Sequence, residues 1–195
     1  CSEPHVIGQS GTQQQYLLAD GAKIICDPNA TLSPKGRGCL VVSVGSNGDA
    51  AFEKAVHGLS PLCQIDVMDG TLVGDRAHLR KRLPKYVHFT GDNYNSTTWE
   101  RYRGRSVDVL KIDCEGCEFS SLLPLVRHIC VDQIALEIHA CQSKGKRSRE
   151  PTRSVSIGAR HSPFDRAMLV HTLLSQLDVL YHIFEKQPNF VYSDG

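Results

Sequence analysis

The segment Val107-Asp-Val-Leu-Lys-Ile-Asp-Cys-Glu-Gly-Cys-Glu118 decides the fold of this chain. Its mostly apolar first half, from Val107 to Ile112, is typical of a buried strand, and that strand ends at Asp113. A turn with Gly116 follows, and then a helix that begins with acidic residues. Ligands of open α/β sheets bind outside the carboxyl ends of the strands. We therefore expect Asp113, Glu115 and Glu118 to gather acceptor groups at that edge.

A second segment of the same kind, Leu40–Val44, leads into the turn Gly45-Ser-Asn-Gly48. Glycines there let the backbone approach a ligand closely, and the following helix offers free N–H groups. This predicts a nucleotide-type cofactor bound by Gly45, Ser46, Asn47 and Gly48. The spacing lacks the full G-x-G-x-x-G pattern of dinucleotide-binding proteins, so a plain tight turn remains the alternative.

The next two strands also end on acidic residues. Gln64–Met68 runs into Asp69 and Gly70, about 20 residues after the glycines, where a carboxylate meets the ribose diol in dinucleotide-binding folds. The alternative is that Asp69 caps the helix that follows it. Asp92, after the strand that ends at Phe89, is a candidate acceptor for an adenine amino group, with an Asx-turn as the alternative.

The fifth apolar segment carries Glu137 and His139, which alternate along the strand and so share one face near its end. A histidine there can titrate near neutral pH and act as a general base. Asp113, Glu137 and His139 are therefore the candidate catalytic residues. The alternative is a histidine that is hydrogen-bonded for structural reasons only.

Cys114 and Cys117 form a C-x-x-C pair after Asp113. Such a pair can be redox-active or half of a zinc site, which His139 and Cys141 would complete. The second half lacks regular spacing, so packing residues in a turn rich in carboxylates are the simpler interpretation.

The length is enough for one α/β domain, and the composition is within the range of soluble globular domains. The chain has 195 residues, 41% of them hydrophobic, and a formal net charge of +1. That balance gives no field that would favour nucleic acid or a membrane surface as a partner. No apolar run reaches the ~20 residues that span a bilayer, although the chain begins at Cys1 and an upstream anchor is not excluded.

Eight cysteines and two glycosylation sequons, at Asn29 and Asn95, favour the secretory pathway over the cytosol. We expect Cys26 and Cys39 to be bonded, because they flank a loop rich in Pro, Gly and Ser. Cys63 and Cys130 read as small buried apolar residues.

Apolar strands alternate with helical patterns through most of the chain, which predicts a doubly wound, mostly parallel α/β sheet covered on both faces. Residues 1–38 form an N-terminal segment, with a hairpin expected between Tyr16–Leu18 and Lys23–Cys26, and residues 39–195 form the main domain. The predicted strands are 40–44, 64–68, 86–89, 107–112, 133–138 and 179–184. The predicted helices are 50–57, 75–82, 97–103, 118–126 and 164–176.

Residues 142–162 do not continue this alternation of strands and helices. They are polar and basic and show no helical or strand periodicity. A loop this long in a compact domain is usually a functional lid or disordered. Its position after the fifth strand places it at the same edge as Asp113.

Together these features resemble class I S-adenosylmethionine-dependent methyltransferases, and more closely the FkbM-type branch with its metazoan methyltransferase-like members. The resemblance lies in Leu110-Lys-Ile-Asp-Cys-Glu-Gly-Cys-Glu118, which is similar to that branch's Lys-Ile-Asp-x-Glu-Gly-x-Glu signature. Further matches, which extend the resemblance over most of residues 20–190, are 39–45, Phe52-Glu53, 134–139 and 184–189. The resemblance implies a Rossmann-like sheet whose seventh, antiparallel strand would lie beyond residue 195.

The resemblance also implies O-methylation of a sugar, lipid or natural-product hydroxyl, with S-adenosylmethionine as cofactor. Residues 45–48 would hold its methionine part, Asp69 the ribose and Asp92 the adenine side, while Asp113 would lie between cofactor and acceptor. A Gly-Ser-Asn-Gly turn replaces the expected Gly-x-Gly-x-Gly, which gives Asn47 a part in binding.

The acceptor hydroxyl must lose its proton, so we expect His139 or Asp113 to act as base. Alternatively, Mg²⁺ or Mn²⁺ bound by Asp113, Glu115 and His139 would lower the pKa of that hydroxyl. The basic 142–162 loop suits a glycan or another acidic or polyhydroxyl acceptor. Two other functions stay open: an inactive methyltransferase-like binding module and a nicotinamide-dependent dehydrogenase.

Overall fold

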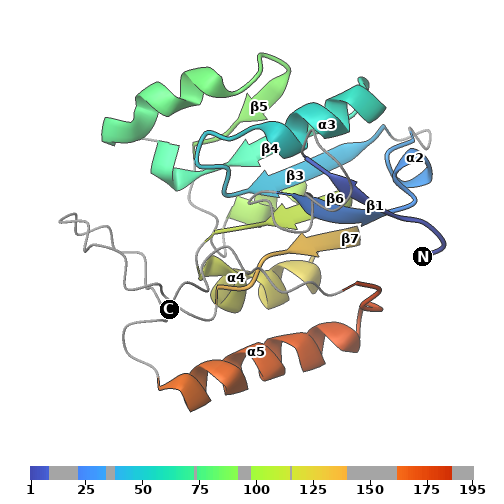
Figure 1. The fold of residues 1–195 in the computed structure, drawn as a ribbon, viewed down its shortest axis with the longest axis vertical. Helices are drawn as coiled ribbons and strands as arrows, with labels where there is room; N and C mark the ends of the chain where they lie inside the picture. The colour runs from blue at the N-terminus through green and yellow to red at the C-terminus, as the bar shows by residue number, and fades with distance from the viewer. Residues whose placement is uncertain are drawn as a thin grey trace.

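Five of the predicted strands pair into one parallel sheet in the computed structural model, which describes residues 1–8, 22–33, 38–72, 74–91, 98–114, 116–139 and 162–185 (Figure 1). The strands are β3 (Leu40–Val44), β4 (Gln64–Met68), β5 (Val87–Phe89), β6 (Ser106–Ile112) and β7 (Cys130–Leu136). Their order is β5-β4-β3-β6-β7, with every pairing parallel. The strand order reverses between β3 and β6, which is where α/β sheets bind their ligands. The predicted fold class is confirmed.

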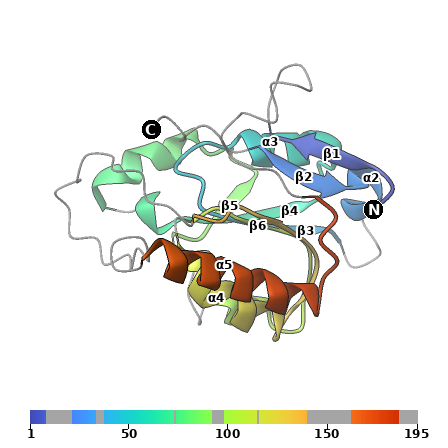
Figure 2. The same cartoon turned by 60° about the horizontal axis from the view of Figure 1, so that its bottom comes forward.

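Helices cover both faces of this sheet (Figure 2). On one face lies α3 (Ala51–Leu59), together with the short α2 (Pro28–Thr31). On the other lie α4 (Cys117–Val126) and α5 (Pro163–Asp178). In the described part of the chain, the 3₁₀ helices Gly70–Leu72, Gly74–Arg82 and Thr98–Tyr102 lie in the connections between strands.

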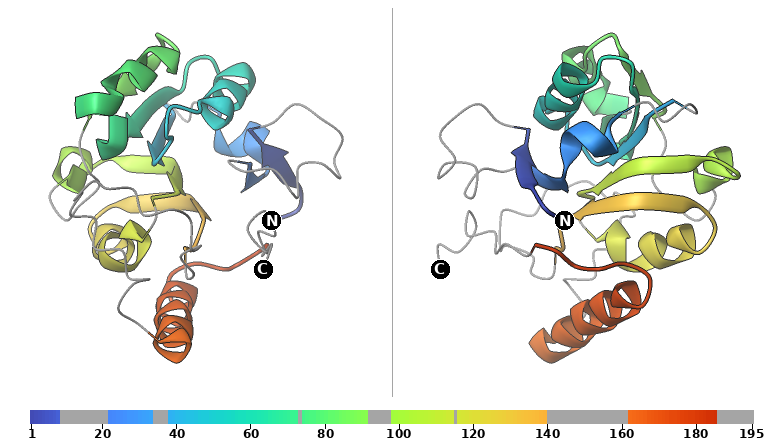
Figure 3. Two further views of the ribbon diagram at one scale, coloured as in Figure 1. Left: turned by 60° about the vertical axis from the view of Figure 1, so that its left-hand side comes forward. Right: turned by 90° about the vertical axis from the view of Figure 1, so that its right-hand side faces the viewer.

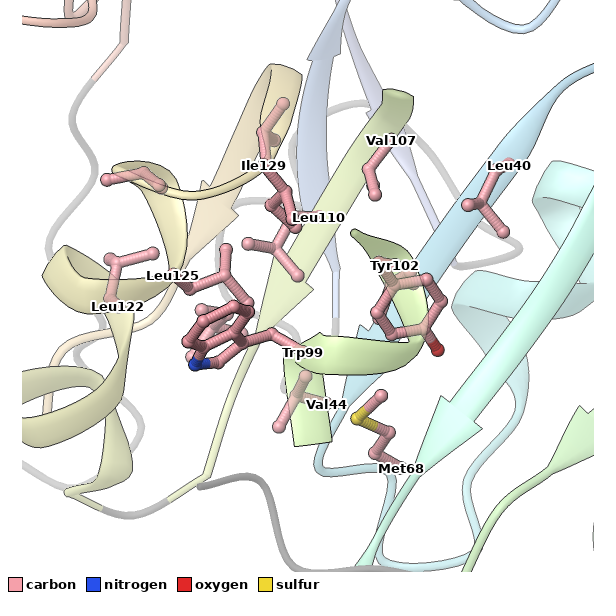
Figure 4. Packing of buried hydrophobic residues seen from close by; sticks show 14 of the residues in the cluster. Leu40, Val44, Met68, Trp99, Tyr102, Val107, Leu110, Leu122, Leu125 and Ile129 are labelled. Atoms are coloured by element: carbon pink, nitrogen blue, oxygen red, sulfur yellow. The ribbon is translucent and has the colours of Figure 1, made fainter. Parts of the chain in front are cut away.

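Strand alternation divides the core into two clusters. Val41 and its neighbours pack under Phe52 and Val56 of α3. Val42 faces the other way, into a larger cluster that includes Leu122 of α4 (Figure 4). Because both of its faces are buried, the central strand β3 is a nearly continuous apolar run rather than an alternating one.

A two-stranded antiparallel hairpin, β1 (Pro4–Ile7) with β2 (Lys23–Cys26), lies outside the main sheet, on the side of α3 (Figure 3). Gln133 of β7 fastens it, accepting from Cys26 N over 2.8 Å and donating to Cys26 O over 2.8 Å. Lys23–Cys26 is a strand as predicted and pairs with β1, while its predicted partner Tyr16–Leu18 lies outside the described residues.

The cysteine pairing differs from the predicted Cys26–Cys39 bond. Cys26 is bonded to Cys1, and the Cα atoms of the two cysteines lie 5.4 Å apart. The antiparallel register sets Pro4 opposite Cys26, so the residues just before Pro4 lie near Cys26. Cys39 is bonded to Cys63, because each precedes one of two adjacent parallel strands that pair Leu40 with Gln64.

The remaining cysteines also correct the sequence analysis. Cys114 and Cys117 are bonded to each other across the turn before α4, so they are more than packing residues. Cys63 is buried as expected but forms a disulfide, and Cys130 is exposed with a free thiol.

One predicted strand was wrong. Residues 179–184 form no strand, because α5 continues to Asp178 and the chain then runs through a turn. The predicted helices at 75–82 and 97–103 are 3₁₀ helices. The predicted loop lies outside the described residues, apart from Ser162, which caps α5 by accepting from Asp165 N.

Candidate active site

The turn after β3 lies against the backbone that follows β6. Gly45 has a φ of +77°, and a Cβ built there would stand 1.7 Å from the carbonyl oxygen of Asp113. Asn47 and Gly48 also have positive φ, of 50° and 79°. Only glycine permits this approach at position 45, so the sequence Gly45-Ser-Asn-Gly48 brings the ends of β3 and β6 together.

Asp69, at the end of β4, is hydrogen-bonded to this turn. Its Oδ2 accepts from Ser46 N over 2.9 Å, Ser46 Oγ over 3.1 Å and Asn47 N over 2.6 Å. Its Oδ1 accepts from Thr71 N over 2.9 Å and Thr71 Oγ1 over 2.6 Å, so the predicted capping role is present at Gly70–Leu72. Burial by itself raises the pKa of Asp69, but the hydrogen bonds from Thr71, Ser46 and Asn47 lower it below the usual value.

Two buried charged residues beneath the turn were missed as site residues by the sequence analysis. Lys111 of β6 donates from Nζ to Gly45 O over 2.7 Å. Glu53 of α3 is fully buried and accepts from Ser43 Oγ over 2.5 Å, while its Oε2 has no hydrogen-bond partner. The signal was in the sequence, because a lysine inside an apolar strand and a glutamate among apolar helix residues both need a structural reason.

Asp113, Glu137 and His139 come together at the ends of β6 and β7. The backbone ladder continues one residue beyond each strand, as Asp113 N donates to Val44 O and Glu137 N to Ile112 O, both over 2.9 Å. Single ligand atoms of the three side chains lie within 4.8 Å of one another. The sequence analysis therefore selected three side chains that the fold places side by side.

His139 is surrounded by carboxylates. Its Nε2 lies 3.6 Å from Asp113 Oδ1 and 3.7 Å from Glu137 Oε1. Its Nδ1 lies 3.4 Å from Oε1 of the fully buried Glu118, which also accepts from His139 N over 2.8 Å. Burial alone lowers the pKa of His139, but Glu118 and then Asp113 and Glu137 raise it above the ordinary value.

Glu118 holds the backbone of His139 and lies beside its imidazole. Its Oε2 accepts from Gly116 N over 2.8 Å, which ties the first turn of α4 to the preceding loop. Burial by itself raises the pKa of Glu118, but the contacts with His139 lower it, so the group is a carboxylate at neutral pH. Glu118, the acidic residue in the first turn of α4, therefore faces His139 rather than solvent.

Lys23 is the most important residue that the sequence analysis missed. From β2 its Nζ reaches Asp113 Oδ2 at 3.2 Å and Glu137 Oε2 at 2.8 Å. These partners are 90 and 114 residues away in the sequence, so no local motif could predict the contact. The only sequence signal was a lysine at the head of an otherwise apolar strand.

Two predicted site residues, Asp92 and Glu115, lie outside the described residues. Among the described ones, Gly45 to Gly48, Asp69 and Gly70 form one group at the ends of β3 and β4. Asp113, Glu137 and His139 form a second, and the contact between Gly45 and Asp113 joins the two.

A family model described as "Methyltransferase domain" matches residues 1–167. The chain belongs to this methyltransferase family. No match was found among curated proteins or among solved structures. The matched range begins before the β1–β2 hairpin, so Lys23 lies within the methyltransferase domain together with the glycine turn and the acidic group.

Proposed function

We propose that this methyltransferase is of the FkbM type, uses S-adenosylmethionine, and methylates a hydroxyl of a glycan or another polyhydroxyl acceptor. The observation that carries the proposal is the contact between Gly45 and Asp113. It sets a glycine turn suited to a cofactor directly beside a histidine with three carboxylate neighbours. A donor of methyl groups and an acceptor of protons are the two parts that O-methylation requires.

The glycine turn supports the assignment of the cofactor. Positive φ at Gly45, Asn47 and Gly48 leaves a backbone that side chains would obstruct. Asp69 binds the ribose in this proposal, although five hydrogen bonds from the protein already reach its two oxygens. A carboxylate has about four acceptor positions, so ribose would have to replace Thr71 or part of the turn. Asp92 is proposed for the adenine side.

The chemistry assigns roles to the acidic group. The cofactor supplies a methyl group on a sulfonium, and the protein must align a hydroxyl with it. His139 Nε2 accepts the proton of that hydroxyl, and Asp113 and Glu137 stabilise the imidazolium that results. The competing route is a divalent ion held by Asp113, His139 and either Glu115 or Glu137, which would acidify the hydroxyl.

The acceptor and the compartment follow from weaker signals. Six basic residues in 142–162 favour an acidic or polyhydroxyl acceptor. Three disulfides among the described residues support an oxidising compartment, and Asn29 of the first sequon is exposed. None of the described helices is both long and apolar enough to cross a bilayer.

Calorimetry with S-adenosylmethionine, S-adenosylhomocysteine and NAD separates the candidate functions. Binding of the first two without NAD supports a methyltransferase, whereas NAD binding alone would indicate a dehydrogenase. Transfer of a tritiated methyl group to a member of a glycan panel then distinguishes an enzyme from a module that binds without turnover. Cofactor binding without transfer to any acceptor would favour the binding module.

A further inference from the structure

Lys23 is held as an ammonium ion between two carboxylates. Only 7% of its side chain is exposed. Its Nζ lies 3.2 Å from Asp113 Oδ2 and 2.8 Å from Glu137 Oε2, so the buried ammonium is paired with both carboxylates.

The same two carboxylates face His139 with their other oxygens. Asp113 presents Oδ2 to Lys23 and Oδ1 to His139, and Glu137 presents Oε2 to Lys23 and Oε1 to His139. The ammonium and the imidazole thus share one carboxylate pair. Asp113, Glu137 and His139 have the spacing of a divalent metal site, and the Lys23 ammonium lies against two of its three ligands.

A metal ion bound beside His139 and this ammonium would compete for the same two carboxylates. The ammonium and a metal ion carry charges of the same sign, and a divalent ion feels twice the repulsion of a monovalent one at the same distance. Binding of such an ion would therefore require Lys23 to leave. The hairpin opposes this, because Gln133 holds β2 at Cys26 and the Cys1–Cys26 bond closes its end.

We propose that Lys23 is a positioning residue that occupies the cation position between Asp113 and Glu137, so that methyl transfer at this site proceeds without a divalent metal ion. The lysine holds both carboxylates toward His139 and neutralises part of their charge. The proposal rests on the proposed function for its catalytic part, and its binding part can be tested without an acceptor.

The binding test compares Mn²⁺ affinity, followed by electron paramagnetic resonance, of the wild type and Lys23→Met. We expect Lys23→Met to bind one Mn²⁺ at least tenfold more tightly than the wild type, because three ligands lose their competing cation. Adding Asp113→Asn to Lys23→Met should abolish that site. Lys85→Met, which removes an exposed lysine, is the matched control and should behave as the wild type. Equal Mn²⁺ affinity in the wild type and Lys23→Met would overturn the proposal.

The activity test uses the same variants once an acceptor is found. Wild-type turnover should be insensitive to EDTA, Lys23→Met should lower kcat at least tenfold with little change in cofactor affinity, and Lys23→Arg should restore part of it. Loss of wild-type activity to EDTA, with recovery on adding Mg²⁺ or Mn²⁺, would refute the metal-free site. Lys23→Gln replaces Lys23→Met in both tests if the latter does not fold. If no acceptor is methylated, the proposed function fails while the Mn²⁺ comparison still decides the role of Lys23.

Discussion

Asn47 donates its backbone N–H to Asp69 Oδ2 over 2.6 Å, so the carboxylate that ends β4 is bonded to the turn that ends β3. This bond turns the N–H groups of Ser46 and Asn47 toward the protein. The shape of the glycine turn therefore depends on a residue 22 positions away in the sequence. Any contribution of Asp69 to cofactor binding includes this support of the turn.

Replacing Asp69 with Ala should weaken S-adenosylhomocysteine binding by roughly 1–3 kcal/mol, since the ribose hydroxyls that are buried in the complex lose their acceptor. Calorimetry measures the affinity and thermal unfolding checks the fold. Thr71→Val is the control, because it removes one hydrogen bond to Asp69 and leaves those to the turn intact. A folded Asp69→Ala protein with wild-type affinity would exclude Asp69 from the binding site.

Gly45→Ala should destabilise the protein by about 2–5 kcal/mol, because the new methyl group clashes with the Asp113 backbone at a positive φ. Gly58→Ala, in α3, is the matched control: nothing lies within 4 Å of its added Cβ, and alanine favours a helix by up to about 1 kcal/mol. Melting temperatures should therefore move in opposite directions. Equal melting temperatures for the two variants would contradict the close approach of Gly45 to Asp113.

His139→Ala should lower turnover by about 10²-fold or more and leave cofactor affinity nearly unchanged, as expected for a general base. Single-turnover kinetics with labelled cofactor measures the first quantity and calorimetry the second. Wild-type turnover in the variant would move the role of base to Asp113.

The pH profile should show the influence of Glu118. His139 must be neutral to accept a proton, and its raised pKa places the acidic limb of the kcat/KM profile above the ordinary histidine pKa of about 6.5. Glu118→Gln removes a carboxylate and should move that limb to lower pH. The stability from His139 should be fully present below pH 6.5 and lost as the pH rises through the folded pKa. An acidic limb that does not move in Glu118→Gln would count against His139 as the titrating group.

Peptide mapping without reduction should find Cys1–Cys26, Cys39–Cys63 and Cys114–Cys117, with Cys130 open to alkylation. In protein from a secretory host, Asn29 or Asn95 should carry glycan.

The double replacement of Cys39 and Cys63 by Ala should lower the free energy of unfolding by about 3 kcal/mol, because that bond closes a long loop in the unfolded chain. The same change at Cys114 and Cys117, three residues apart, should cost less. If peptide mapping finds only free thiols and both asparagines without glycan, the secretory pathway is excluded and the cytosol is favoured.

The sequence predicted the central strands β3 and β4 best, because they are buried on both faces and therefore mostly apolar. Leu40–Val44 and Gln64–Met68 were predicted with their observed bounds. Residues 179–184 carry a similar apolar pattern but form no strand, since the local pattern does not specify a pairing partner. The register of the parallel strands could not be predicted from the sequence. The Cys39–Cys63 bond was therefore missed, because it depends on the pairing of Leu40 with Gln64.

The candidate site was predictable where acids follow strands. Asp113, Glu137 and His139 could be found because neighbouring parallel strands end at the same edge. Lys23 could not, because its hairpin crosses onto that edge from far away in the sequence. The hydrogen bonds of Asp69 to the turn depend on the exact path of the backbone, which residue types do not fix.

The contact of Gly45 with the Asp113 carbonyl has a kinetic consequence. The backbone of the turn cannot shift toward β6 without moving Asp113, and Asp113 in turn contacts Lys23 and His139. A molecule that fixes the position of the turn would therefore also fix the position of the Asp113 carboxylate, which faces the acceptor in the proposed function. We expect an ordered bi-substrate mechanism, with the donor binding first and the methylated product leaving before the spent donor.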